Sequence, residues 1–276
     1  MFKLRIISFT GLLAVLAVIF WGGRLGMHVF SVLAAAVAGL MVYELGTMLD
    51  KVALHSWKRT AAAVAVAVML VFSYWTPPLA WLVAAVFAVA ATFSWFLLLT
   101  STDFAVAAKK TVVSTALLAL TLPIVCALEM IGSSSLAVFA YVVLVTKAGD
   151  TGAYCVGMLS NKITRGRNHK IAPRISPNKS FEGAIGGLVI TIGVSLALGM
   201  GCGWVSWSWP YLIIAGILMF WGSFFGDLTE SALKRGCGVK DSASILPGMG
   251  GIWDVMDSFI YNAPALGLIF LLFSLN

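Results

Sequence analysis

The sequence predicts an all-α integral membrane protein, a polytopic bundle of about nine transmembrane helices with a cytoplasmic N-terminus. Hydrophobic residues make up 61% of its 276 residues and charged residues 11%, whereas soluble domains carry about 45–50% and about 25%. This composition excludes an ordinary soluble fold and also intrinsic disorder. The apolar residues form long unbroken runs instead of alternating with a period of two, which favours helices over strands as the membrane spans.

Each predicted element is a run of about 20 mostly apolar residues, the length that a helix needs to cross a bilayer. Pro77 and Pro78 mark the turn after the third run, and Pro210 suits the first turn of a helix. The nine predicted spans are residues 6–22, 26–48, 60–76, 78–99, 111–131, 135–157, 183–203, 210–231 and 252–274.

Basic residues collect on one side of this arrangement. The N-terminus and the loops after the second, fourth, sixth and eighth spans hold 16 of the 18 Lys and Arg residues. Because positive loops stay in the cytoplasm, the N-terminus is predicted inside and the C-terminus outside. The predicted location is the cell (inner) membrane, with multiple passes.

Residues 1–132 are predicted to be a transmembrane scaffold. Glu44 and Asp50 near the inner end of the second span are interpreted as interfacial, and Glu129 lies near the outer end of the fifth span.

Acidic residues gather in residues 133–276, all near the cytoplasmic face. Asp227 with Glu230, and Asp254 with Asp257, are spaced i, i+3, so each pair is expected to share a helix face. Like charges about 4 Å apart repel by about 4 kcal/mol at an effective dielectric constant near 20. We therefore expect a metal ion, Lys or Arg partners, or both, unless these are separate solvated residues at helix ends.

Two basic loops, 159–181 and 233–251, lie on the same face and are predicted to form the catalytic region. The first is rich in Lys and Arg, which is also typical of a loop that only fixes topology or contacts anionic lipid. Ser180 is a candidate N-cap for the next span. The second loop ends in Gly250 and Gly251 before a helix, where free N–H groups can bind phosphate, although glycine is also common at such positions.

Carboxylates able to hold Mg²⁺, with Lys and Arg groups for phosphates, are the components that phosphoryl or nucleotidyl transfer needs. A membrane-embedded site at the cytoplasmic face indicates one lipid substrate and one soluble nucleotide.

The stretch SALKRGCGVKDSASILPGMGGIWDVMD, residues 231–257, resembles the signature of the phosphatidate cytidylyltransferases, the CDP-diacylglycerol synthases. The segments 149–183 and 225–231 are also similar to that family. Two positions depart from its pattern, Met249 in place of a histidine and Val255 in place of an arginine. The residues in register with the signature are Ser231, Lys234, Arg235, Lys240, Asp241, Ala243, Leu246, Pro247, Gly250, Gly251, Asp254 and Asp257.

The resemblance implies that CTP and phosphatidate react to give CDP-diacylglycerol and pyrophosphate. It implies Mg²⁺ as cofactor, with K⁺ as a second cation, and Asp227, Asp254 and Asp257 as metal ligands. Together with Lys234 and Arg235, these three form the predicted catalytic set. The predicted substrate-binding residues are Asp150, Lys170, Arg174, Ser176, Lys179, Ser180, Glu182, Ser231, Lys240, Asp241, Gly250 and Gly251.

The expected partners are CTP, phosphatidate and membrane lipid, with a homodimer by analogy and no nucleic acid. A transferase or kinase acting on a polyprenyl-type phosphate or alcohol is an alternative. A CDP-alcohol phosphotransferase is disfavoured, because its motif begins with Asp-Gly and the chain has no Asp-Gly. A transporter, an alternative of another class, is disfavoured because the polar residues cluster at one face and not at mid-membrane.

Overall fold

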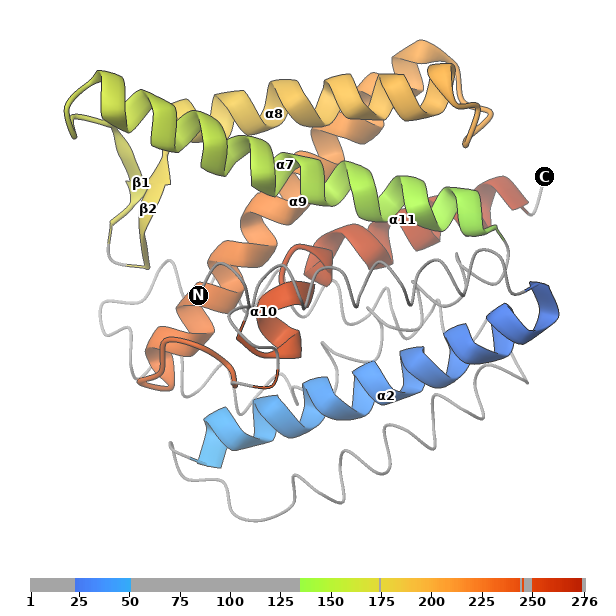
Figure 1. Cartoon of the computed structure of the whole chain (residues 1–276), viewed down its shortest axis with the longest axis horizontal. Coiled ribbons are helices and arrows are strands. Elements are labelled where there is room, and N and C mark those ends of the chain that lie inside the picture. Colours follow the sequence, from blue (N-terminus) through green and yellow to red (C-terminus); the bar gives the residue numbers. More distant parts are fainter. Residues whose placement is uncertain (1–22, 51–134, 174, 244, 246–249, 275–276) are drawn as a thin grey trace.

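The computed structural model describes residues 23–50, 135–173, 175–243, 245 and 250–274, and the structural statements below refer to these residues. They form several helices and one short β-hairpin (Figure 1). The elements in order are α2 (Gly23–Asp50), α7 (Leu136–Ile163), β1 (Lys170–Ala172), β2 (Ser176–Ser180), α8 (Phe181–Leu196), the π-helical turn η1 (Ala197–Gly201), α9 (Trp209–Gly236), α10 (Ile252–Met256) and α11 (Phe259–Ser274).

Four helices in the described residues are long and apolar enough to cross a membrane: His28–Met48, Leu136–Ile163, Phe181–Gly201 and Trp209–Gly236. They match the spans predicted at 26–48, 135–157, 183–203 and 210–231. The predicted spans 6–22, 60–76, 78–99 and 111–131 lie outside the described residues.

The ninth predicted span, 252–274, is wrong as a single helix, because the structure divides it into α10 and α11. The division falls at Asp257 and Ser258. The Asp257 carboxylate accepts a hydrogen bond from its neighbour's backbone, from Ser258 N to Oδ1 at 2.6 Å. A side chain that binds local backbone in this way competes with the helical hydrogen bonds. Asp254 and Asp257 therefore do not share the face of one continuous helix.

The loop predicted over residues 159–181 contains the two short strands β1 and β2. The fold is therefore not the purely helical one that the sequence had predicted. β1 and β2 are antiparallel, with Lys170 opposite Ser180 and Ala172 opposite Ser176. α7 runs to Ile163, past its expected end at 157. Buried Asn168 holds the turn after α7 against the end of that helix, because its Nδ2 donates a hydrogen bond to the Gly157 carbonyl at 3.0 Å.

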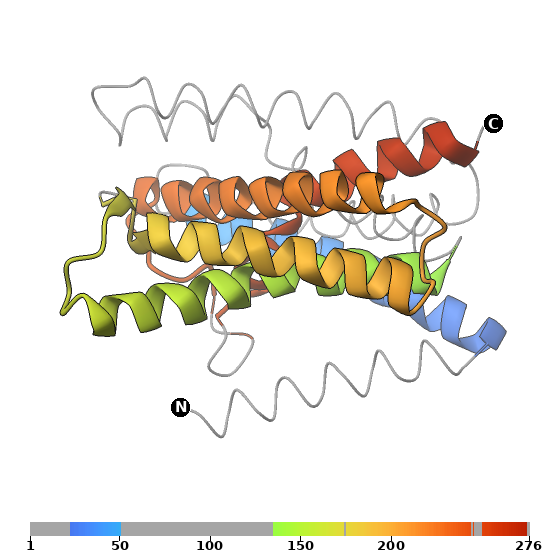
Figure 2. The ribbon, with the colours of Figure 1, turned by 90° about the horizontal axis from the view of Figure 1, so that it is seen from above.

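The helices α7, α8 and α9 pack against one another, and Figure 2 shows them side by side. Glycine permits the closest approach. A Cβ atom at Gly187 of α8 would lie 2.9 Å from the Gly149 carbonyl oxygen of α7 and 2.8 Å from the Phe220 ring of α9. On the other side, α2 packs against α10, and Met41 and Leu45 join Trp253 in the main apolar core.

We expect Gly187→Ala to destabilise this three-helix packing, because the added methyl group overlaps atoms of both neighbouring helices. Overpacking of this kind costs about 1–3 kcal/mol. The matched control is Gly193→Ala in the same helix, where an added Cβ meets no atom within 4 Å. Thermal unfolding in detergent should show a lower midpoint for Gly187→Ala and no decrease for Gly193→Ala. Equal midpoints would contradict the packing described here.

Candidate active site

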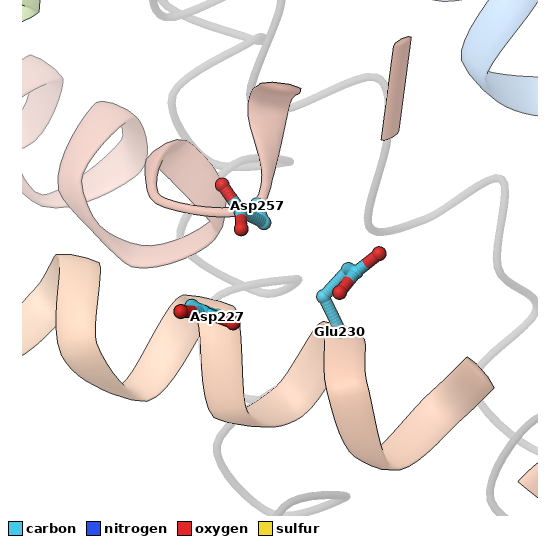
Figure 3. A group of neighbouring side chains, drawn as sticks. All are labelled: Asp227, Glu230 and Asp257. Carbon is cyan, nitrogen blue, oxygen red and sulfur yellow. The ribbon is translucent and has the colours of Figure 1, made fainter. Parts of the chain in front are cut away.

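Three carboxylates from two parts of the chain form an acidic cluster. Asp227 and Glu230 are one turn apart on α9, and Asp257 lies in the turn between α10 and α11 (Figure 3). One oxygen from each of the three lies within 4.8 Å of the others. Glu230 is 2% exposed, so the cluster extends from a buried position on α9 to the half-exposed Asp227.

The backbone makes this approach possible at Gly226. A Cβ atom there would collide with the carbonyl oxygen of Asp257 and would lie 3.4 Å from the Ser258 Cα atom. Only a residue without a side chain lets the turn between α10 and α11 come this close to α9. The break in the helix and the small residue on α9 together place Asp257 over Asp227.

Lys147 joins the cluster to a fourth carboxylate, on α7. Its Nζ atom lies 3.3 Å from Asp150 Oδ2, 3.6 Å from Asp257 Oδ1 and 2.8 Å from Ser258 Oγ. The hydroxyl of Ser258 also lies 2.6 Å from Asp150 and 2.8 Å from Asp257. Ser223 of α9 donates a further hydrogen bond to Asp150.

The hairpin brings a second lysine to the cluster. Lys179 of β2 lies 3.0 Å from Asp227 Oδ2, donates to the Phe224 carbonyl at 2.9 Å and lies 4.4 Å from the centre of the Phe224 ring. Beside it is a cavity of about 210 Å³ between α7, α8, α9 and the hairpin. Its polar lining includes Asp150, Ser176, Asn178, Lys179, Ser180, Ser223 and Asp227.

The ends of the hairpin are held by side chains that the sequence assigned to substrate. Ser180 is the N-cap of α8, because its hydroxyl accepts a hydrogen bond from Gly183 N at 3.2 Å. Glu182 pairs with exposed His169, with Oε1 at 2.9 Å from Nδ1. The first contact joins the end of β2 to the first turn of α8, and the second joins that turn to the residue before β1.

Lys234 connects the cluster to Asp254. Its Nζ atom is 2.7 Å from Glu230 Oε1 and 2.7 Å from Asp254 Oδ1. Asp254 also accepts hydrogen bonds from Gly251 N at 2.6 Å and from the Ser242 backbone N at 3.1 Å. Asp254 is therefore held by the loop before α10, and the third carboxylate of the cluster is Glu230, whereas the predicted metal ligands are Asp227, Asp254 and Asp257.

The remaining predicted residues that the structure describes differ in their exposure and in their contacts with the cluster. Ser231 donates to Asp227 Oδ1 at 3.3 Å, and Gly250 has a φ angle of 94°, which favours glycine. Arg174 and Met249 lie outside the described residues. The exposed members of the predicted set are Lys170, Arg235, Lys240 and Asp241.

The predicted site residues omit two buried acids, Glu44 and Glu230, and several hydroxyl groups. Glu44 of α2 is 1% exposed and accepts hydrogen bonds from the loop before α10. Ser223, Ser242 and Ser258 each contact an aspartate. The one signal that was available is the glutamate inside an apolar span, where a charge is costly and is usually functional.

The chain matches a family pattern over nearly all of its length and individual curated proteins over half of it. Residues 3–273 match the pattern of the Cytidylyltransferase family. A phosphatidate cytidylyltransferase of Staphylococcus saprophyticus is 43% identical over 137 residues, and those of Staphylococcus haemolyticus and Staphylococcus aureus are each 42% identical over 137 residues. Each alignment covers 50% of this chain and 50% of the relative, so the matched part spans about half the length of these curated relatives.

The family match includes the whole region described above, namely the acidic cluster, the hairpin with Lys179 and the loop that holds Asp254. On this match, the chain belongs to the Cytidylyltransferase family.

Proposed function

We propose that this protein transfers the cytidylyl group of CTP to phosphatidate, giving CDP-diacylglycerol and pyrophosphate. The observation that carries the proposal is the cluster of Asp227, Glu230 and Asp257 with lysines on three sides, in a chain of this family. The name of the staphylococcal relatives supports phosphatidate as the acceptor. We place the site at the cytoplasmic face of the cell membrane, in a bundle of nine spans with its N-terminus inside.

The charges of the site favour one divalent cation. Five carboxylates are linked through direct contacts to three ammonium groups, so the group has a formal charge of −2 when all five acids are ionised. Three carboxylates within 4.8 Å of one another suit Mg²⁺, which binds oxygen ligands and shares them with substrate phosphates. Asp227, Glu230 and Asp257 would hold the ion, and Asp254 would act through Lys234. When bound, Mg²⁺ supplies positive charge that stabilises the departing pyrophosphate.

The chain's own groups bind and orient the two substrates. The phosphate of phosphatidate is already an anionic nucleophile, so no general base is needed. Lys179, at the wall of the 210 Å³ cavity, can bind a phosphate group there, together with the hydroxyl of Ser176. Exposed Arg235 and Lys240 attract the triphosphate from solution.

We infer that Lys147 supplies the positive charge that K⁺ would otherwise bring. Its ammonium group lies between Asp150 and Asp257, where a monovalent cation would balance the same charges. A transferase acting on a polyprenyl-type phosphate or alcohol, or a transporter, remains the alternative to be tested. The homodimer stays a prediction.

The first test measures turnover of the purified protein in detergent–lipid micelles. With CTP, phosphatidate and Mg²⁺, we expect pyrophosphate and CDP-lipid in equal amounts, and neither product with EDTA. Product formed only with a polyprenyl phosphate would change the acceptor. If CTP binds but no lipid is labelled, the proposed reaction is wrong.

Asp227→Asn and Asp257→Asn should each lower turnover at least about hundredfold, because each removes a charge that balances the cation. Binding of Mn²⁺, followed by electron paramagnetic resonance, should weaken in the same two variants. Glu129→Gln is the matched control, since the sequence places this carboxylate near the opposite face. Wild-type turnover and Mn²⁺ affinity in both aspartate variants would exclude the cluster as the metal site.

Lys147→Met should make activity depend on an added monovalent cation. Removing one partner of this partly buried charge cluster leaves the others uncompensated, so turnover should fall about tenfold or more without K⁺ and recover in part with it. Wild-type turnover should be the same when K⁺ is replaced by N-methylglucamine at constant ionic strength. A wild-type enzyme that requires K⁺ would show that the Lys147 ammonium group does not replace this ion.

A further inference from the structure

The buried carboxylate of Glu44 lies far along the chain from the acidic cluster. It belongs to α2, in the half of the sequence predicted to be scaffold, and it is 1% exposed. Within the described part of the chain, no Lys or Arg nitrogen forms an ion pair with it. A buried carboxylate without a cation is costly unless hydrogen-bond donors surround it.

Those donors come from the loop before α10 and from the first turn of that helix. Glu44 Oε1 accepts from Ile252 N at 2.8 Å, and Oε2 accepts from Trp253 N at 3.0 Å and from Ser242 Oγ at 2.9 Å. The indole of Trp253 adds a fourth bond between the same two segments, from Nε1 to the Met41 carbonyl at 2.8 Å. Hydrogen bonds to a charged acceptor are the strong ones.

The same loop holds Asp254 in place. Ser242 Oγ lies 3.0 Å from Asp254 Oδ2 as well as 2.9 Å from Glu44 Oε2, so its single proton is shared between the two carboxylates, and Ser242 N donates to Asp254 Oδ2 at 3.1 Å. Gly251 N donates to Asp254, while the next two backbone N–H groups donate to Glu44. These N–H groups, which the sequence assigned to phosphate, already have carboxylate acceptors within the chain.

From these contacts we propose that Glu44 is a positioning residue of the candidate active site. It fixes the start of α10 and, through Ser242, the direction of the Asp254 carboxylate that holds Lys234 against Glu230. The N-terminal half of the chain would then help to shape the site. This inference rests on the proposed function for its kinetic test only.

The test is Glu44→Gln, which keeps the size of the side chain but puts an NH₂ group opposite backbone N–H donors. We expect kcat to fall about 10- to 100-fold, as for other residues that orient catalytic groups, while KM for CTP and phosphatidate changes less than about twofold. Glu44→Asp keeps the charge and should recover part of the loss. Amide hydrogen exchange in residues 242–256 should become faster in Glu44→Gln, with exchange in α8 unchanged.

The matched control is Tyr141→Phe, which removes a buried 2.6 Å hydrogen bond to Ser195 away from the site. It should lower the melting temperature without changing kcat. A Glu44→Gln enzyme with wild-type kcat, or an equal loss of kcat in both variants, would overturn the proposal.

Ser242→Ala is the second variant, for the case that Glu44→Gln does not fold. It removes the hydroxyl that contacts both Glu44 and Asp254 and should reduce kcat severalfold, while full activity would count against the proposal. If the wild-type protein does not use phosphatidate, the proposed function fails. The hydrogen-exchange comparison then still decides whether Glu44 orders residues 242–256.

Discussion

Negative charge gathered at one end of α9 is the constraint on which the rest of this structure depends. Asp227, Glu230 and Asp257 lie too close together to stay ionised at the edge of an apolar bundle without positive partners. The chain provides Lys147, Lys179 and Lys234 from three different elements. Because these lysines compensate only part of the formal charge, we propose that a further cation, shared with the phosphate of a substrate, balances the rest.

The backbone is arranged to bring these charges together. The hairpin turns β2 back over α9, so that Lys179 reaches Asp227, and the Ser180 cap sets where α8 begins. Gly226 admits the turn that carries Asp257. The hairpin and the turn between α10 and α11 interrupt regular helix. Backbone groups that lose their helical hydrogen bonds at such places must find partners in solvent or in polar side chains.

The sequence predicts the spans and part of the cluster, because both depend on local periodicity. Runs of apolar residues located four helices correctly, and the i, i+3 spacing put Asp227 and Glu230 on one face of α9. The same spacing did not carry over to Asp254 and Asp257, since Ser258 and the Asp257 carboxylate break the helix between α10 and α11. The interpretation of Glu44 as interfacial was wrong, because it is buried against Ile252 and Trp253, which lie 208 and 209 residues away along the chain.

The departure at Val255 fits the same electrostatic argument. The related signature has arginine at this position, directly after Asp254, and valine removes that charge. In this structure Asp254 receives its positive partner from Lys234 of α9, and its remaining hydrogen bonds from Ser242 and Gly251. Lys147 contributes a further ammonium group on the far side of the cluster. The positive partners of the carboxylates thus come from α7, β2 and α9, and α10 supplies only the carboxylate of Asp254. For this reason the orientation of α10, which Glu44 fixes, matters more here than an additional charge on it.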